Sequence, residues 1–591
     1  MHVTDRLRAL GGVPRLGLAV VPGGLGLAVP GRSWGVPTAD PAALLTALEA
    51  EFTPRWTWWS AASALGPAGP AGPAGPVQLA RCHDLAAVHR VLDGGTREDP
   101  GAVWAAARGL PAPPPPSRRP AAAHGTGLLD LDGAADAGTP VLADGTLAPA
   151  WADGRVFDTD DPDPAERLER AGRWAALALD VAAAQTARLA ALPDRRAEPA
   201  GPPLPVQTGY AESAAAALAV ELSRTGLPLD RSTAEAIVGA AVGPRPADEA
   251  AERLARTARD DLVRRHLGPG GASVDLRNPA HVLTALRGLG FDLPDTRAHR
   301  LERLREAHPA VAALLVWRKA ERLATTYGYP WLNEHVGADG RLRGAWSAAD
   351  AAAGRMTAQA GLHNLPAELR PAVAAEPGHV LVRADLGQVE PRVLAAVSGD
   401  PGLVAATREE DLYAPVAAAL GADRPTAKVA VLAAMYGQTS GAAGEALRRM
   451  ERAYPRALAY LRAAEEAGRQ GRDVRTYGGR LVRISDLAPA DPGAATAARG
   501  RFARNAVVQG AAAELFKAWA ATVRAGLAGT GGRIVLCLHD ELLLHVPGPD
   551  AHRAAELLRV ALQQTATRWA SGSGVRFVAD VAVVRRWSEA K

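Results

Sequence analysis

The stretch RIVLCLHDELLLHV (533–546) contains two apolar runs separated by three ionisable residues. Aliphatic runs of this length, bounded by polar residues, are typical of β-strands, so the pattern predicts a hairpin with His539, Asp540 and Glu541 at its tip. A carboxylate at a strand end can reach a substrate rather than the core. Taken alone, the segment is equally well explained as an ordinary polar hairpin tip.

A second aspartate occupies a comparable position. The segment HVLVRADLGQVEPRVLAAVSGD (379–400) begins as a strand and continues as a helix, with Pro391 in the first helical turn. Asp385 lies at the end of that strand, where it could also be a turn or helix-cap residue. Two strand-end aspartates that meet in space can hold two divalent ions for in-line phosphoryl transfer.

A basic helix supplies the phosphate-binding element that such chemistry needs. In DRPTAKVAVLAAMYGQTSG (423–441), Arg424, Lys428, Leu432 and Tyr436 recur every four residues and share one helical face. Two cations, an apolar side chain and an aromatic ring could grip a triphosphate, cover a base and stack on its neighbour. A solvated amphipathic helix is the alternative. It fits Lys428 less well, because only four of the 67 basic residues are lysine.

In order and spacing, the segments at 379–400, 423–441 and 533–546 resemble motifs A, B and C of the family A DNA polymerases, the DNA polymerase I type. GRMTAQAGLHNLPAELR (354–370) is similar to the family's GR-x-S segment followed by N-L-Q-N-I-P. ARGRFARNAVVQGAAAELFKAW (498–519) is similar to its R-x3-N-x3-Q-G helix. The resemblance covers roughly residues 208–591.

Several positions depart from the family pattern. Leu386, Gly387 and Pro391 replace Tyr, Ser and Leu of the motif D-Y-S-Q-I-E-L-R. Leu432 stands where the family has Phe or Tyr, and Tyr413 stands where many members have His. The metal ligands and cations are unaffected, so these changes bear on speed, fidelity and sugar discrimination rather than on the reaction.

The resemblance implies how the chemistry is divided among residues. Asp385 and Asp540 would hold two Mg²⁺ ions, and Glu541 would support them. Arg424 and Lys428 would bind the triphosphate, and Lys428 could protonate the departing pyrophosphate.

Substrate contacts are implied in the same way. Glu390 would fill the space that a ribose 2′-hydroxyl needs, Tyr436 would stack at the template position, and Arg355 would probe the minor groove, where acceptors are nearly independent of sequence. The resemblance assigns dNTP contacts to Arg424, Lys428, Leu432, Tyr436, Gln388, Glu390 and Tyr413, and DNA contacts to Arg355, Arg392, Arg501, Asn505, Gln509, His539 and Gly437.

The implied fold is α+β: a right-hand polymerase, with a palm sheet and helical fingers and thumb, preceded by a smaller α/β exonuclease-like domain. We expect a degenerate 3′–5′ exonuclease-like domain over 1–200, the thumb over 208–330, and the palm and fingers over 331–591 (fingers about 401–480). The Pro-rich AGPPLPV (200–206) marks the first boundary. Too little chain remains for a 5′ nuclease domain.

The N-terminal region lacks the residues that exonuclease chemistry requires. No D-x-E occurs in residues 1–200, and Asp158 and Asp160 come too soon before Asp180 to replace it. Asp180 resembles the last aspartate of an exonuclease site but has no companions. We therefore expect 3′–5′ exonuclease activity to be absent.

Composition sets the remaining bounds. A chain of 591 residues with 48% hydrophobic and 22% charged residues is expected to form several soluble domains. Its net charge of +4 and its pI of about 9.2 are compatible with a nucleic-acid partner. Two cysteines support neither a disulfide framework nor a zinc site. We expect a cytoplasmic monomer without signal peptide or membrane span.

The sequence thus predicts template-directed addition of dNTPs to a DNA primer, in repair or replication. Two alternatives remain. A single-subunit RNA polymerase shares the palm, but Glu390 argues against it. A non-catalytic DNA-binding module is disfavoured by the joint presence of Asp385, Asp540, Arg424 and Lys428.

Overall fold

The computed structural model describes residues 3–10, 12–66, 71–72, 75–116, 139–154, 156–157, 163–350, 353–437, 442–485 and 492–590. The chain divides into two compact units. The first unit comprises Met1–Thr225, Ala345–Ala358 and Pro377–Val584, and the second comprises Gly226–Gly344, Gln359–Glu376 and Arg585–Lys591. This division does not follow the expected boundaries near 200 and 330, and the division into three domains stays a prediction.

A five-stranded mixed sheet forms the N-terminal part of the first unit. Its order is β3-β2-β1-β4-β7, antiparallel from β3 to β1 and parallel from β1 to β7. The strands are β1 (Arg15–Val21), β2 (Gly24–Val29), β3 (Arg32–Pro37), β4 (Arg55–Trp58) and β7 (Arg81–Asp84), with the short pair β5 (Ala71–Gly72) and β6 (Gly75–Pro76) outside the sheet. The helices are α1 (Val3–Arg8), α2 (Pro41–Phe52), α3 (Ala61–Leu65), α4 (Leu85–Asp93), α5 (Pro100–Arg108), α6 (Pro149–Ala152) and α7 (Pro164–Ala190).

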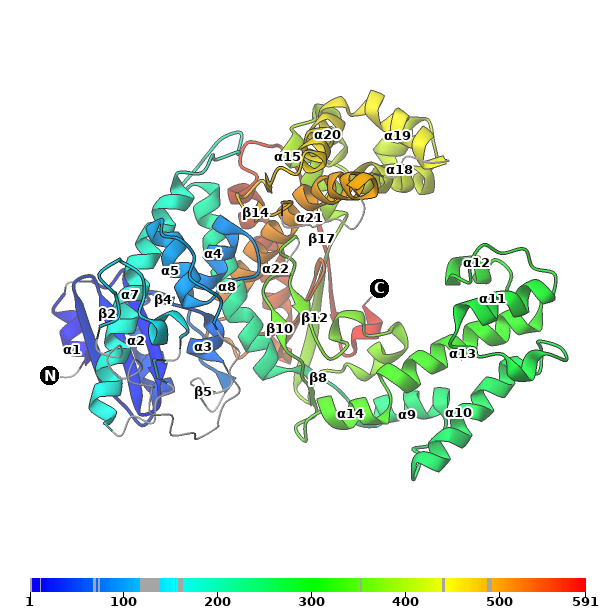
Figure 1. The fold of residues 1–591 in the computed structure, drawn as a ribbon, viewed down its shortest axis with the longest axis horizontal. Helices are drawn as coiled ribbons and strands as arrows, with labels where there is room; N and C mark the ends of the chain where they lie inside the picture. Colours follow the sequence, from blue (N-terminus) through cyan, green and yellow to red (C-terminus); the bar gives the residue numbers. More distant parts are fainter. Residues whose placement is uncertain are drawn as a thin grey trace. The chain divides into compact units, whose positions relative to one another are not determined.

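Helix α7 crosses the face of this sheet over β2 (Figure 1). The approach is close because glycines on the strands leave room for the helix backbone: a Cβ on Gly26 would lie 2.1 Å from Ala171 C, and one on Gly17 would lie 2.4 Å from Ala175 O. Small residues on both sides therefore set how deeply α7 packs.

A second, four-stranded antiparallel sheet, the C-terminal sheet, has the order β15-β16-β12-β17. Its strands are β12 (His379–Leu386), β15 (Arg533–Leu538), β16 (Glu541–Pro547) and β17 (Ala579–Val584). Val382, Ala384 and Leu386 pack into the buried core on one face, together with residues of α8 (Leu204–Thr225), α21 (Pro492–Gly526) and α22 (Ala551–Trp569). Because side chains alternate along a strand, Arg383 and Asp385 face the other side.

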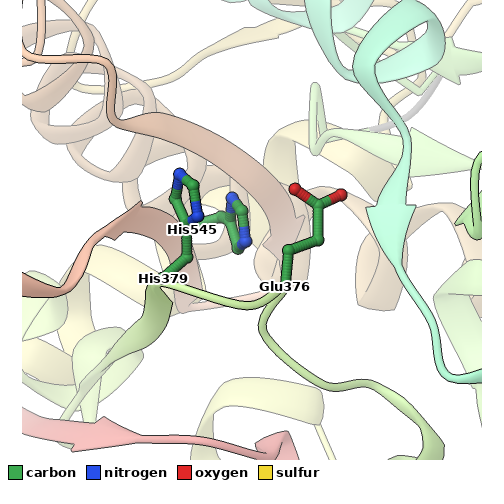
Figure 2. Close-up of side chains that lie close together, drawn as sticks. All are labelled: Glu376, His379 and His545. Atoms are coloured by element: carbon green, nitrogen blue, oxygen red, sulfur yellow. The ribbon is translucent and has the colours of Figure 1, made fainter.

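Two histidines lie at the end of the C-terminal sheet far from Asp385: His379 begins β12, and His545 lies near the end of the neighbouring β16. The rings of His379 and His545 are stacked with centroids 4.4 Å apart (Figure 2). Glu376, also drawn there, belongs to the second unit, where it forms an ion pair with Arg341 at 2.6 Å. The histidine pair is therefore separate from the strand ends that carry the aspartates.

A helical segment is inserted between β12 and β15. Its helices are α15 (Val389–Ser398), α16 (Pro401–Ala406), α17 (Tyr413–Leu420), α18 (Arg424–Tyr436), α19 (Ala442–Ala453) and α20 (Pro455–Arg469), followed by α21. The buried Arg504 of α21 donates to Ala434 O at 2.6 Å and to Glu465 at 2.8 Å. It thereby ties the end of α18 to α20 and α21. Short strand pairs flank this region: β10 (Trp346–Ser347) with β11 (Thr357–Ala358), and β13 (Val474–Arg475) with β14 (Leu481–Val482).

The second unit is mainly helical. It contains α9 (Arg231–Val242), α10 (Glu249–Arg264), α11 (Pro279–Gly288), α12 (Ala298–Glu302), α13 (Pro309–Thr326), α14 (Tyr329–His335), β8 (Leu227–Pro228) and β9 (Arg341–Leu342). Buried Asp260 on α10 accepts hydrogen bonds from Arg277 and from the Trp317 indole. Within the described ranges, no helix in either unit has the length and apolar character needed to cross a membrane.

Candidate active site

The predicted carboxylates converge at one edge of the C-terminal sheet. Glu541 pairs directly with Asp385 across β16 and β12. A two-residue turn between β15 and β16 holds Asp540 beside them, with His539 in the left-handed region at φ 54°. Leu386 N donates to Asp540 O at 2.9 Å, which fixes the turn to the end of β12.

Burial and mutual repulsion perturb these acids. Burial, followed by the charge of Asp540, raises the pKa of Asp385 to about 6. The pKa of Asp540 is also raised, first by burial and then by the nearby Glu541 and Glu390 carboxylates. Half-buried carboxylates that repel one another favour a bound cation, and carboxylate oxygens are what Mg²⁺ prefers. The donor set therefore fits a divalent metal.

Arg383 is a member of the site that the sequence interpretation missed. Its Nη2 donates to Asp385 Oδ2 at 2.6 Å, and its Nε donates to Glu541 Oε1 at 2.9 Å. Asp580 on β17 lies 3.7 Å from its Nη1. The signal was present, since a residue two positions before Asp385 in a strand must share its face.

Helix α18 presents its two cations differently. Asp423 caps the helix by accepting from Thr426 N. Arg424 is bound by Asp411, with Nε 2.6 Å from Oδ2, and its guanidinium lies 5.6 Å from the Tyr413 ring centroid. Lys428 is exposed and forms no ion pair with any residue that the structure describes. Asp411 is a second residue that sequence interpretation did not identify.

A pocket of about 190 Å³ joins α18 to the His539–Asp540 turn. Most predicted nucleotide-site residues meet there. Its lining consists of Arg355, Gln388, Val389, Glu390, Pro391, Tyr413, Leu432, Gln509, Ala512, Ala513, Phe516, His539 and Asp540. The pocket therefore places an aspartate of the hairpin and the apolar position of α18 around one small volume.

Glu390 is held in this pocket by Tyr436. The Tyr436 hydroxyl donates to Glu390 Oε2 at 3.4 Å. Burial raises the pKa of Glu390, while the Arg355 charge and the Tyr436 hydrogen bond oppose that shift. Burial also raises the pKa of Tyr436. The pair joins the first turn of α15 to the last turn of α18.

Arg392 does not have the DNA-contacting position that the sequence suggested. Its side chain is fully buried, and burial lowers its pKa to about 10. The guanidinium donates to Gln388 Oε1 and to the carbonyls of Gly387, Thr407, Glu409, Glu410 and Arg576. Gln388, at φ 49°, also accepts from Leu412 N. Arg392 therefore braces the turn after β12, because no surface of it is left for DNA.

The remaining predicted contacts lie along α21 and beside the hairpin. Asn505 is half-buried and Gln509 is 9% exposed, whereas Arg501 is exposed. A Cβ on Gly437, the left-handed cap of α18, would lie 3.3 Å from Arg501 Cγ. Arg355 is half-buried, 3.8 Å from Asp350, and His539 is exposed on the hairpin turn; both line the pocket.

The N-terminal sheet shows no comparable group of carboxylates in its described residues. Strand β1 carries none, since it reads RLGLAVV. Asp180 lies on the surface of α7 and is 3.4 Å from Arg108. Asp158 and Asp160 lie outside the described residues.

An antiparallel sheet with converging carboxylates, beside a helix with two cations at its N-terminal end, is the kind of site that metal-assisted phosphoryl transfer uses. Residues 290–589 match the model of DNA polymerase family A. Because this match covers more than half of the chain, the chain belongs to that family.

The chain is 33% identical over 320 residues to DNA polymerase I of Chloroflexus aurantiacus, covering 49% of this chain and 33% of that one. It is 32% identical over 319 residues to the thermostable DNA polymerase I of Thermus filiformis, covering 49% of this chain and 38% of that one. The chain thus spans about a third of the length of these curated relatives.

Its fold is similar to the POL domain of Pol1 from M. smegmatis, solved in complex with DNA primer-template and dNTP. The TM-score is 0.64 at 20% identity, covering 99% of this chain and 98% of that one. At this identity the likeness establishes the fold, and the expected α+β polymerase fold is confirmed.

Proposed function

We propose that the protein is a DNA-directed DNA polymerase that adds dNTPs to the 3′ end of a DNA primer. The observation that carries this proposal is that Asp540 of the hairpin and Leu432 of α18 line the same pocket. Lys428 lies one helical turn before Leu432 on α18. Primer extension with a labelled primer-template, each dNTP and Mg²⁺ tests it. Failure of the purified chain to extend the primer would favour the non-catalytic DNA-binding alternative.

The residues present fit the metal that this reaction requires. Asp385 and Asp540 would hold two Mg²⁺ ions, which, when bound, lower the pKa of the attacking hydroxyl and neutralise charge on the phosphate. Lys428 would bind the triphosphate and hold a proton near the departing pyrophosphate. Arg424 would exchange Asp411 for a phosphate oxygen.

Sugar selection is assigned to Glu390. Its carboxylate lines the pocket and is bound by Tyr436, so it occupies a defined volume next to Leu432. Glu390→Ala should therefore raise the use of rNTPs relative to dNTPs by roughly 10-fold or more, about 1.4 kcal/mol in transition-state binding. Steady-state kcat/KM for dATP and ATP on one template measures the ratio.

Glu390→Gln is the matched control, because it keeps the volume of the side chain and removes its charge. We expect this variant to remain selective against rNTPs. Loss of selectivity in Glu390→Gln would assign discrimination to charge rather than to bulk. A wild-type enzyme that accepts rNTPs as readily as dNTPs would favour the RNA-polymerase alternative instead.

We further propose that the N-terminal part does not proofread. Two-metal exonuclease chemistry needs clustered carboxylates, whereas exposed Asp180 is paired with Arg108 and β1 carries no carboxylate. Single-stranded and 3′-mismatched labelled DNA incubated with Mg²⁺ and no dNTP should stay intact. Shortening that persists in Asp385→Ala but is lost in Asp180→Ala would show an active exonuclease.

The proposal includes primer-template DNA and dNTPs as the binding partners. A role in DNA repair or replication, a monomeric state and a cytoplasmic location stay predictions from the sequence.

A further inference from the structure

We propose that Arg383 is a built-in positive charge of the candidate metal site, which holds Asp385 and Glu541 in place and lowers the site's affinity for divalent cations in the absence of nucleotide. The proposal rests on the proposed function only in naming Asp385 and Asp540 as the metal ligands. It assigns Arg383 a positioning and tuning role.

The contacts of Arg383 fix its charge in space. Its side chain is 11% exposed, and that of its partner Glu541 is 7% exposed. Nε binds Glu541 at 2.9 Å while Nη2 binds Asp385 Oδ2 at 2.6 Å. If the guanidinium moved away, it would give up its ion pairs with both carboxylates, one of them nearly buried, which is strongly unfavourable. The positive charge therefore stays at the sheet edge.

This fixed charge changes what the carboxylates can offer a metal. An arginine remains protonated at every working pH, so its effect cannot be titrated away. It engages Oδ2 of Asp385, so that this oxygen is shared between the guanidinium and any metal, and it compensates the charge of Glu541. A divalent ion bound to Asp385 would lie a few ångströms from a like charge, and such repulsion lowers affinity.

A purely structural role for Arg383 is the competing explanation. Glu541 is on β16 and Arg383 on β12, so the ion pair could serve only to join the hairpin to its neighbouring strand. In that case the loss of Arg383 would lower stability without strengthening metal binding. The two explanations therefore differ in the sign of the effect on metal affinity.

The experiment measures Mn²⁺ binding to the full chain, without DNA or nucleotide, by the electron paramagnetic resonance of free Mn²⁺. Arg383→Met should bind Mn²⁺ about 10-fold or more tightly than wild type, a difference of about 1.4 kcal/mol. Arg533→Met is the control, because it removes an equal charge from the far end of the C-terminal sheet. Its affinity should match that of wild type.

Two further variants make the result specific. Adding Asp385→Ala to Arg383→Met should abolish the gain, which locates the ion. The comparison of Arg383→Met with unchanged Arg383 is repeated in a Glu541→Gln background, because Glu541→Gln removes the nearly buried negative charge that Arg383 balances and so protects the fold of the variant. The same tightening is expected there. Unchanged or weaker Mn²⁺ binding after loss of Arg383 in a folded background would overturn the proposal.

Because this measurement contains no primer or dNTP, its outcome is independent of primer extension. A chain that binds Mn²⁺ more tightly without Arg383 but never extends a primer would keep the inference and reject the proposed function. An active polymerase whose Mn²⁺ affinity is unchanged by the loss of Arg383 would support the proposed function and reject the inference.

Discussion

Asp385→Ala and Asp540→Ala are each expected to abolish primer extension, by roughly 1,000-fold or more, while primer-template affinity stays nearly unchanged. The loss follows because each carboxylate is a proposed metal ligand, and metal-based charge stabilisation contributes several kcal/mol at about 1.4 kcal/mol per tenfold in rate. DNA affinity, by contrast, comes from phosphate contacts spread over a much larger surface. Single-turnover extension and fluorescence anisotropy measure the two quantities.

Asp580→Ala is a matched control for this pair. Asp580 lies opposite Asp385 on β17 and is 3.7 Å from Arg383, so its removal takes a carboxylate from the same sheet edge. Its side chain is 70% exposed, whereas that of Asp385 is 33% exposed, and we expect less than about a 10-fold loss of rate. Substantial extension by Asp385→Ala or Asp540→Ala would reject the assignment of both aspartates as metal ligands.

Local pattern was sufficient for the strands that carry the site. The change from strand to helix within 379–400 and the apolar runs flanking Asp540 predicted two strand ends, and the structure brings them into register as Asp385 opposite Glu541. The spacing of four placed Leu432 and Tyr436 on one face of α18. Leu432 lines the same pocket as Glu390, and Tyr436 forms a hydrogen bond with Glu390. These features depend on residues close in sequence, which is why sequence alone could predict them.

What could not be predicted depends on contacts between distant segments. The burial of Arg392 follows from carbonyls contributed by two segments distant in sequence, residues 407–410 and Arg576, and no sequence spacing reveals them. The ion pair of Arg424 with Asp411 joins the first residue of α18 to the segment just before α17, and the sequence does not show that these two residues meet. In the N-terminal region, β4 and β7 have only four residues each, too short for a periodic signal.

Lys428→Ala is expected to lower kcat/KM for dNTP incorporation by roughly 100-fold, through both a higher KM and a lower kcat. Lys428 is exposed on α18 one turn from Leu432, and within the described ranges its ammonium has no carboxylate to compete with a triphosphate. A contact to the leaving group strengthens as negative charge develops there, so its loss must affect kcat as well as binding.

Two variants on α18 separate this effect from general loss of charge or helix stability. Arg424→Ala should act mainly on KM. Arg424 must give up its ion pair with Asp411 before it binds a phosphate, so its net contribution to the free energy of binding is smaller than that of Lys428. Val429→Ala, at an exposed neighbour on the same helix, should leave both constants within about twofold of wild type. Pre-steady-state incorporation of one dNTP gives the two constants separately. If Lys428→Ala has the kinetics of Val429→Ala, the basic end of α18 is only a solvated surface. If Lys428→Ala lowers kcat while Arg424→Ala changes KM alone, the two cations have distinct roles, and Lys428 is the one that acts on the leaving group.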